Sequence, residues 1–449
     1  MNELLDNYIE KHFNDIKNAL SRLVQHPSIS GEREGTFPFG RGCAKALDEL
    51  LQIASELGFK TKNYDYYLGT VDYGEEPSLA ILGHLDVVPV CADDWETPPF
   101  ELSERNGCFF GRGAIDDKGP VISALFAMKA IKESGIKLSQ GVRLILGCTE
   151  ETGTEADLKH YLKYEKMPER VFTPDGDFPV ITTEKAMIHF SFSRSLDQSK
   201  MNIVSLNGGS VVNAVPSSAT ALVRNIHRFP KYEHITAIET NNGYEITAHG
   251  VPSHASKPAE GRNAITLLLS YLSLLSLSDY DKAFVKSLSD TFPHGESDGA
   301  SIGIKADENE YATTCIFSIA ELKNGVFIGQ SDVRCGISLK SAEACNRIKT
   351  KFSEYNLSFD YISEAHIVDP KCDFVQTLLS AYTDVTGFKP FCRTIGGGTY
   401  VHNIENGVAF GMEFPGDNNN MHAANEFVKA NDLKLSTKVY AEAILQLCK

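Results

Sequence analysis

Hydrophobic and polar positions over the first 180 residues predict helices and strands in turn. Apolar residues recur at helical spacing over residues 42–59 and 119–135. Two nearly continuous apolar runs, residues 77–90 and 141–148, are typical of strands that are buried on both faces. Strands of this kind, separated by helices, predict an α/β fold with a mostly parallel sheet flanked by helices.

The pattern changes after Lys185. Residues 187–195 and 244–250 alternate polar and apolar positions, which predicts strands with one exposed face, and residues 263–277 predict one strong helix. Helix and strand alternation resumes from about residue 366 and ends in a helix over residues 432–448. The simplest architecture is an α/β domain formed by residues 1–183 and 366–449, with an α+β domain of residues 184–365 inserted into it.

Neither the N-terminus nor the most apolar run indicates a membrane protein. Residues 1–20 mix acidic and basic positions at helical spacing, which predicts an amphipathic surface helix rather than a signal peptide. Residues 267–278 are broken by serines and fall well short of the roughly 20 residues that a membrane span needs. We therefore expect a cytoplasmic protein with no membrane partner.

Composition excludes a further class of partner. The 449 residues carry a net charge of −16, with 43 Lys and Arg against 59 Asp and Glu, and no basic stripe is present. Binding of a nucleic-acid backbone depends on clustered basic residues, so we expect no nucleic-acid partner. The ten cysteines have no CxxC pair and no regular spacing, which predicts free thiols.

Two polar residues interrupt the apolar stretch ILGHLDVVPV at residues 81–90. In an extended chain His84 and Asp86 point to the same side while Leu85 points to the other. A buried histidine bonded to a nearby carboxylate explains the pair as well as a metal ligand with its partner does. The residues at the ends of other predicted strands are needed to distinguish these two interpretations.

Further acids and one histidine lie where predicted elements begin or end. Taken singly, each has an ordinary explanation, such as a helix N-cap or a solvated loop residue. Together they place many carboxylates at the carboxyl edge of one sheet, where like charges would force protonation unless cations compensate them. Imidazole mixed with carboxylate suits zinc, manganese or cobalt better than calcium or magnesium. The set consists of His84, Asp116, Glu150, Glu151, Asp175 and His422.

Eight motifs, in this order, resemble the metallopeptidase family of aminoacylases, glutamate carboxypeptidases and bacterial dipeptidases, and among these the PepV-like dipeptidases. The match extends from residue 26 to His422 and implies a zinc-peptidase-like catalytic domain with an inserted α+β lid domain. The motifs are GHLDVVP, W followed by PPF, GRGAIDDKGP, TEETG, PDGDFP, GVPSHASKPAEGRNA, GGGT and MHAANE.

The resemblance implies two divalent metal ions, Zn²⁺ in the first place and Mn²⁺ or Co²⁺ as alternatives. It implies that Asp116 bridges the two ions. His84 and Asp175 would complete one metal site, and Glu151 and His422 would complete the other.

The resemblance also implies three catalytic roles. Asp86 would orient the imidazole of His84. Glu150 would be the general base that takes a proton from the attacking water and passes it to the leaving amine. His254, in the inserted domain, would stabilise the oxyanion of the tetrahedral intermediate.

Five further positions match those expected to bind the C-terminal carboxylate of a substrate. Asn213 and Arg334 belong to the predicted lid, and arginine suits the task because its planar fork meets a carboxylate with two hydrogen bonds. Three glycines would bring backbone amides close to the same carboxylate, although flexible turn geometry also explains them. These glycines are Gly396, Gly397 and Gly398.

The leading hypothesis is a dinuclear dipeptidase that acts on short peptides with a free C-terminal carboxylate. An amidohydrolase that removes acyl groups from amino acids is the alternative within the family. A binding protein without catalysis would need ligands but no base, so Glu150 disfavours it, and a serine hydrolase lacks its GxSxG motif here. The long inserted domain predicts a monomer in which His254 serves its own chain.

Overall fold

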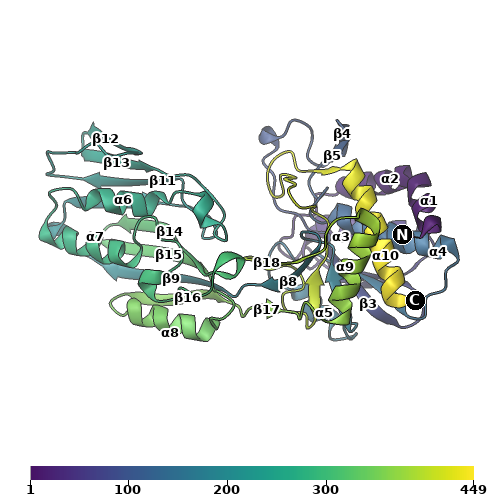
Figure 1. Ribbon diagram of the computed structural model, residues 1–449. Helices are drawn as coiled ribbons and strands as arrows, with labels where there is room; N and C mark the ends of the chain where they lie inside the picture. The colour runs from purple at the N-terminus through teal and green to yellow at the C-terminus, as the bar shows by residue number, and fades with distance from the viewer. Residues whose placement is uncertain (1) are drawn as a thin grey trace. The chain divides into compact units, whose positions relative to one another are not determined.

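The computed structural model describes residues 2–449 and contains two compact units, each with its own sheet and core (Figure 1). Unit 1 comprises the chain up to Thr182, Ile367–Arg393 and Gly398–Lys449, and unit 2 comprises Thr183–His366 and Thr394–Gly397. The chain passes between the units within β8 (Val180–Glu184), at β17 (His366–Ile367) and around β18 (Cys392–Ile395).

The main sheet of unit 1 is parallel at its centre, and the pairs β1 with β2, β2 with β6, and β19 with β8 are antiparallel. Its order is β1-β2-β6-β3-β7-β19-β8-β17, with β18 paired to β8, and the parallel pairs are β6 with β3, β3 with β7, and β7 with β19. The α/β fold predicted from the sequence is confirmed, and parallel pairing joins the four central strands β6, β3, β7 and β19. The strands not yet given bounds are β1 (Lys60–Tyr64), β2 (Leu68–Tyr73), β3 (Pro77–His84), β6 (Gly141–Gly147), β7 (Arg170–Thr173) and β19 (Gly407–Ala409).

Helices cover this sheet, and a small three-stranded sheet, β20-β5-β4, accompanies it. The helices of unit 1 are α1 (Glu3–Lys11), α2 (Phe13–Val24), α3 (Gly40–Glu56), α4 (Lys118–Ser134), α5 (Ala156–Tyr161), α9 (Asp373–Thr386) and α10 (Ala430–Cys448). The strands of the small sheet are β4 (Ser103–Arg105), β5 (Cys108–Phe110) and β20 (Phe427–Lys429).

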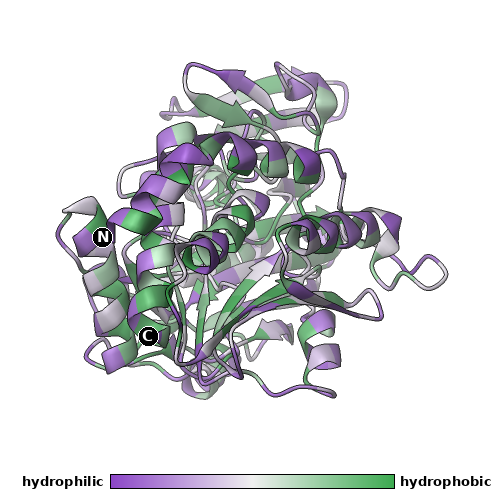
Figure 2. Cartoon of the chain, turned by 90° about the vertical axis from the view of Figure 1, so that its right-hand side faces the viewer, coloured by the Kyte–Doolittle hydropathy of each residue, from purple (hydrophilic) through white to green (hydrophobic). Residues whose placement is uncertain are grey.

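Strand β3 shows why the sheet is buried on both faces. Leu79 and Ile81 join the larger core, which includes residues of α1 to α4, α9 and α10. Ala80 and Leu82 join a second core together with Tyr161 of α5. Hydrophobic residues accordingly gather along the strands and the inward faces of the helices, while hydrophilic residues lie outside (Figure 2).

Two predicted elements differ from the observed ones. The strand predicted over residues 77–90 ends at His84, because beyond it the backbone N–H of Val87 donates to the carbonyl of Ser28, in a loop before α3. The single helix predicted over residues 1–20 is two helices that break at His12. The break allows Leu5 of α1 and Leu20 of α2 both to be fully buried in the core that contains α4.

Unit 2 is an antiparallel sheet, and its helices pack against one face of the sheet to form the core. Its order is β12-β13-β11-β10-β14-β15-β9-β16. Ile188, Phe190 and Phe192 of β9 alternate with more exposed residues and pack with α6, α7 and α8. The elements are β9 (Met187–Ser195), β10 (Ile203–Gly208), β11 (Ser218–Val223), β12 (Ile235–Thr240), β13 (Gly243–His249), β14 (Thr314–Lys323), β15 (Val326–Arg334), β16 (Asn356–Ile362), α6 (Ala264–Leu272), α7 (Asp279–Thr291) and α8 (Ser341–Lys351).

All ten cysteines are free. Within residues 2–449, each helix is too short or too polar to span a membrane.

Candidate active site

Polar side chains gather where the parallel strands of unit 1 end. His84 is the last residue of β3, Glu150 and Glu151 follow β6, and Asp175 follows β7. The carboxyl ends of parallel strands meet at one edge, which is where open α/β sheets place their ligands. Asp116 enters the same region from the segment before α4, and His422 from the loop after β19.

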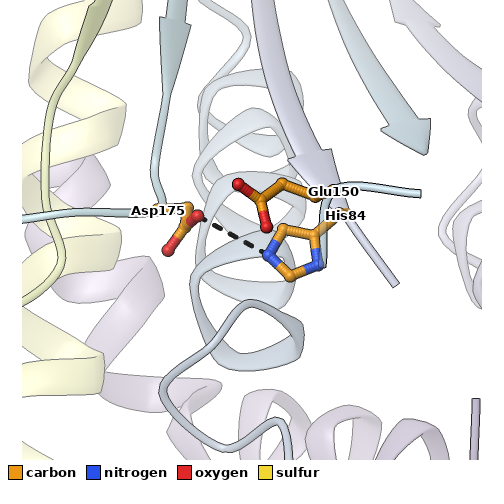
Figure 3. A group of neighbouring side chains, drawn as sticks. All are labelled: His84, Glu150 and Asp175. Atoms are coloured by element: carbon orange, nitrogen blue, oxygen red, sulfur yellow. Dashed lines mark ion pairs between the residues drawn. The ribbon is translucent and has the colours of Figure 1, made fainter. Parts of the chain in front are cut away.

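His84, Glu150 and Asp175 form a first group of donor atoms, all within 4.8 Å of one another. Nε2 of His84 lies 3.6 Å from Oδ2 of Asp175. Figure 3 shows the carboxylates of Glu150 and Asp175 directed toward the imidazole of His84. The imidazole is fully buried, so this group is the inner part of the site.

Asp116, Glu151 and His422 form a second group under the same distance limit. Nε2 of His422 lies 2.7 Å from Oδ2 of Asp116 and 3.2 Å from Oε2 of Glu151. The other oxygen of Asp116, Oδ1, lies 3.0 Å from Nε2 of His84. Asp116 therefore faces both groups, one with each oxygen, and His422, with 54% of its side chain exposed, leaves the second group open to solvent.

Asp86 fixes the orientation of the His84 ring. Nδ1 of His84 lies 3.0 Å from the carbonyl oxygen of Asp86 and 3.5 Å from its carboxylate oxygen Oδ1. A carbonyl only accepts, so Nδ1 carries the proton, and in the neutral ring Nε2 is left with a lone pair. The other carboxylate oxygen of Asp86 accepts a hydrogen bond from the backbone N–H of Glu151 at 3.1 Å.

Charge in the cluster is strongly unbalanced. Burial, together with the neighbouring carboxylates, raises the pKa of Glu150 well above its ordinary value, and burial likewise raises the pKa of Asp175. Asp116 and Glu151 raise the pKa of His422 to about 11. Burial would lower the pKa of His84, but the surrounding aspartates raise it well above its usual range. The carboxylates of the cluster can therefore remain close together only if positive charge compensates them, and protons or metal cations can supply that charge.

The residues present fit divalent metal ions. Nε2 of His84 is buried and makes no hydrogen bond to any described residue, although carboxylate oxygens surround it. Metal-ligating histidines adopt this arrangement: one ring nitrogen donates a hydrogen bond that orients the ring, and the other directs its lone pair at the metal site. Two imidazoles with several carboxylates also match the ligand types of zinc, manganese and cobalt sites.

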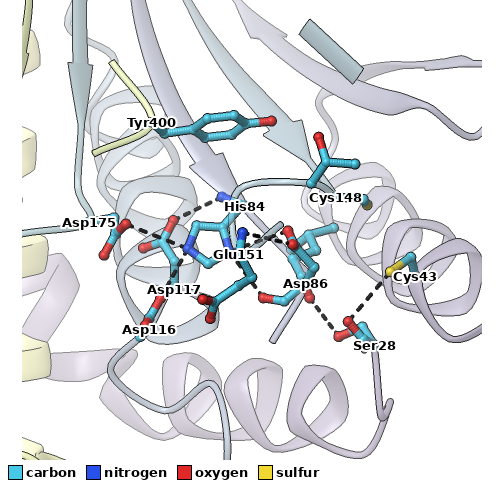
Figure 4. Close-up of polar contacts among 12 residues, drawn as sticks. Ser28, Cys43, His84, Asp86, Asp116, Asp117, Cys148, Glu151, Asp175 and Tyr400 are labelled. Carbon is cyan, nitrogen blue, oxygen red and sulfur yellow. Dashed lines mark hydrogen bonds and ion pairs between the residues drawn. The ribbon is translucent and has the colours of Figure 1, made fainter. Parts of the chain in front are cut away.

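Sequence reasoning predicted Asp86 but missed other residues that hold the ligands in place, among them Ser28, which is labelled in Figure 4. Glu426 is buried and accepts hydrogen bonds from the backbone N–H groups of Ile115 (3.0 Å) and Asp116 (3.3 Å). Ser28 donates its hydroxyl to the carbonyl of Leu85 at 2.5 Å. Glu426 lies in the motif MHAANE, but nothing in that motif distinguishes a group that binds backbone N–H from a ligand.

Two of the predicted lid residues are neighbours in unit 2. Asn213 and His254 lie on adjacent antiparallel segments, in which Val215 donates to the carbonyl of Ser253 and Ala255 to that of Asn213, both at 2.9 Å. Nδ1 of His254 lies 2.7 Å from the hydroxyl of Ser256.

Arg334 and the glycine segment also meet within unit 2. The guanidinium of Arg334 donates from Nε and Nη2 to the two carboxylate oxygens of Asp332, both at 2.7 Å, and from Nη1 to the carbonyl of Gly396 at 2.6 Å. A Cβ at Gly396 would lie 2.5 Å from Cβ of Ser256, so glycine is needed for this approach. A Cβ at Gly397 would meet no atom within 4 Å, and Gly398 is the first residue of the next segment of unit 1.

Comparison with known sequences identifies the relatives. Residues 80–446 match the sequence model described as Peptidase family M20/M25/M40. The chain is 34% identical to Putative dipeptidase YtjP of Bacillus subtilis over 437 residues, covering 92% of each chain. It is 31% identical to a Putative dipeptidase of Staphylococcus epidermidis over 459 residues, covering 97% of each.

Solved structures share the fold at low sequence identity. Human carnosine dipeptidase 1 aligns with a TM-score of 0.63 at 15% identity, covering 99% of this chain and 98% of that one. The M20 family metallo-carboxypeptidase Sso-CP2 of Sulfolobus solfataricus aligns with a TM-score of 0.56 at 17% identity, covering 100% and 99%. These alignments confirm the predicted fold class.

Metal binding has a measurable consequence for stability. Adding Zn²⁺ to metal-free protein is expected to raise the melting temperature, because a ligand at 100 times its Kd stabilises the folded state by about 2.7 kcal/mol. His422→Ala removes one donor and should lose most of this increase. His160→Ala, which changes a histidine of unit 1 that belongs to neither donor group, should retain it. An increase of equal size in His422→Ala would exclude His422 as a ligand.

Proposed function

Because the chain belongs to peptidase family M20/M25/M40, we propose that it is a dipeptidase that cleaves short peptides with a free C-terminal carboxylate, using two divalent metal ions. The chain is a hydrolase that acts on peptide bonds, and the two bacterial relatives reported above both carry the name Putative dipeptidase. One observation carries the two-metal part of the proposal. The two oxygens of Asp116 face two different histidines, each of which belongs to a separate donor group.

In this proposal Asp116 would hold both ions, one with each carboxylate oxygen. His84 and Asp175 would hold one ion, and Glu151 and His422 the other, with Zn²⁺ preferred over Mn²⁺ or Co²⁺. When bound, such ions make a water acidic enough to ionise near neutral pH and polarise the peptide carbonyl.

Glu150 is proposed to act as the general base. Its carboxylate would accept the proton of the attacking water and then deliver it to the leaving amine. Burial and the neighbouring acids raise the pKa of Glu150, which favours a group that both takes and returns a proton. Its position beside His84 and Asp175 makes ligation the competing role.

Unit 2 is proposed to supply the remaining groups. His254 would stabilise the oxyanion, and Asn213 and Arg334 would bind the C-terminal carboxylate together with the backbone amides of Gly396, Gly397 and Gly398. Asp332 already occupies the Nε and Nη2 side of Arg334. A carboxylate would therefore use the Nη1 side and replace the carbonyl of Gly396.

Assays on two substrate classes test the function. Metal-depleted protein reconstituted with Zn²⁺, Mn²⁺ or Co²⁺ separately should hydrolyse unblocked dipeptides and leave N-acetylated amino acids largely intact. The reason is that the proposed site recognises a peptide with a free C-terminal carboxylate. Preferential release of acetate from N-acetylated amino acids would make the chain a deacylase instead.

Glu150→Ala separates the role of base from that of ligand. The variant should retain both metal ions and lose roughly 10²- to 10⁴-fold in kcat, which is the usual contribution of a general base. Metal content by elemental analysis and kcat are measured in parallel, with exposed Glu169→Ala as the control. If metal content falls together with kcat, Glu150 is a ligand, and Glu150 and Glu151 exchange their proposed roles.

Arg334→Ala tests carboxylate recognition. A charged hydrogen bond contributes about 1.5 to 3 kcal/mol, so kcat/KM for free dipeptides should fall roughly 10- to 150-fold more than for C-terminally amidated dipeptides. Comparing two substrates on one variant cancels any loss of folded protein. Arg347→Ala, on α8, is the matched control. Equal losses on both substrates would remove Arg334 from carboxylate binding.

The proposed active species is a monomer in which His254 serves its own chain. Mixing His254→Ala with Glu150→Ala at high concentration, under conditions that allow subunits to exchange, should therefore restore no activity. The activity of the mixture is compared with the sum of the two separate variants. Substantial recovery would mean that His254 acts across a subunit interface.

A further inference from the structure

We propose that Asp157 and Tyr400 are positioning residues that together fix the catalytic segment Thr149–Glu151 and the ring of His84. The proposal rests on the dipeptidase function proposed above. Neither residue belongs to the two donor groups, and both are buried in unit 1. Asp157 is near the start of α5, and Tyr400 lies in a turn before β19.

Asp157 holds the backbone that leads to the proposed base. Its fully buried carboxylate oxygen Oδ2 accepts hydrogen bonds from the backbone N–H groups of Cys148 at 2.6 Å and Thr149 at 3.0 Å. The two donors are the residues directly before Glu150. Because a buried carboxylate binds backbone N–H groups strongly, Asp157 restricts where this segment can lie.

Tyr400 connects this carboxylate to His84. The hydroxyl of Tyr400 donates to Oδ2 of Asp157 at 2.6 Å. The same oxygen accepts from two backbone N–H groups, so the Tyr400 hydroxyl is the donor of this bond. The Tyr400 ring meets the His84 ring edge to face, with centroids 6.2 Å apart and planes at 87° (Figure 4).

Gly147, the last residue of β6, leaves space for the side chains of Asp157 and Tyr400. A Cβ on Gly147 would lie 1.7 Å from the Tyr400 hydroxyl oxygen and 2.6 Å from Oδ2 of Asp157, so only glycine leaves room for them. The carbonyl of Gly147 also accepts a hydrogen bond from Leu85, between His84 and Asp86, at 2.9 Å. The contact among Gly147, Asp157 and Tyr400 thus links the end of β6, which leads to Glu150, with the end of β3, which carries His84.

Loss of this contact should affect the chemistry more than the fold. Partners that orient metal ligands typically contribute 10- to 100-fold in metal affinity or activity. A shift of about 1 Å in a catalytic group can cost 10²-fold in rate. Glu150 and Glu151 both follow directly from the backbone that Asp157 holds.

The test uses two variants and a matched control. Tyr400→Phe removes only the hydroxyl, and Asp157→Asn keeps the shape but removes the charge. Tyr161→Phe is the control, because Tyr161 is fully buried in the same core, and its hydroxyl accepts from Nη1 of Arg143 at 3.0 Å, away from the donor groups. For each variant, Zn²⁺ affinity by chelator competition, kcat and KM on a dipeptide, and the melting temperature are measured.

Tyr400→Phe and Asp157→Asn are expected to lower Zn²⁺ affinity or kcat roughly 10- to 100-fold while KM changes little. Tyr161→Phe should lower the melting temperature without changing Zn²⁺ affinity or kcat. If Tyr400→Phe loses no more affinity and kcat than Tyr161→Phe, Tyr400 is only a core residue and the proposal is wrong.

The affinity measurement needs no activity, so it separates this proposal from the proposed function. Wild-type protein that binds Zn²⁺ but hydrolyses no dipeptide would contradict the dipeptidase function. A selective loss of Zn²⁺ affinity in Tyr400→Phe and Asp157→Asn would still support the positioning role in that case.

Discussion

Buried negative charge at one edge of the unit 1 sheet is the constraint on which the site depends. Four carboxylates, those of Asp116, Glu150, Glu151 and Asp175, converge there on two imidazoles. Like charges cannot all remain ionised in such a setting without cations. The two oxygens of Asp116 face two different histidines, so this residue would contact both cations, one with each oxygen.

A second set of acids holds the first set in place. Each of its members directs a carboxylate oxygen at the backbone N–H of a residue in or beside the cluster, so that the main chain, and not only the side chains, is fixed. Such bonds are costly to lose because a buried N–H that loses its acceptor has no water to replace it. The pairs are Asp117 with His84, Glu426 with Asp116, Asp86 with Glu151, and Asp157 with Cys148 and Thr149. The site is therefore rigid through its backbone, as positioning for catalysis requires.

The elements that carry the cluster were predictable from the sequence, but of the second set of acids only Asp86 was. Apolar runs identified β3 and β6, and the polar residues that follow them marked the sheet edge. The break at His12 and the end of β3 at His84 depend on packing and on a loop contact from Ser28, which no local pattern encodes. An acid that binds backbone N–H groups, such as Asp157, looks in sequence like any solvated aspartate, since its partners are set by the tertiary fold.

Anomalous X-ray scattering from crystals of the zinc-loaded protein is the most direct test of the central claim, that Asp116 bridges two cations. Two anomalous peaks are expected roughly 3.5 to 4 Å apart, each within bonding distance of a different oxygen of Asp116. One peak should also contact Nε2 of His84 and the other Nε2 of His422. A single zinc ion, or two ions that do not share Asp116, would contradict the account.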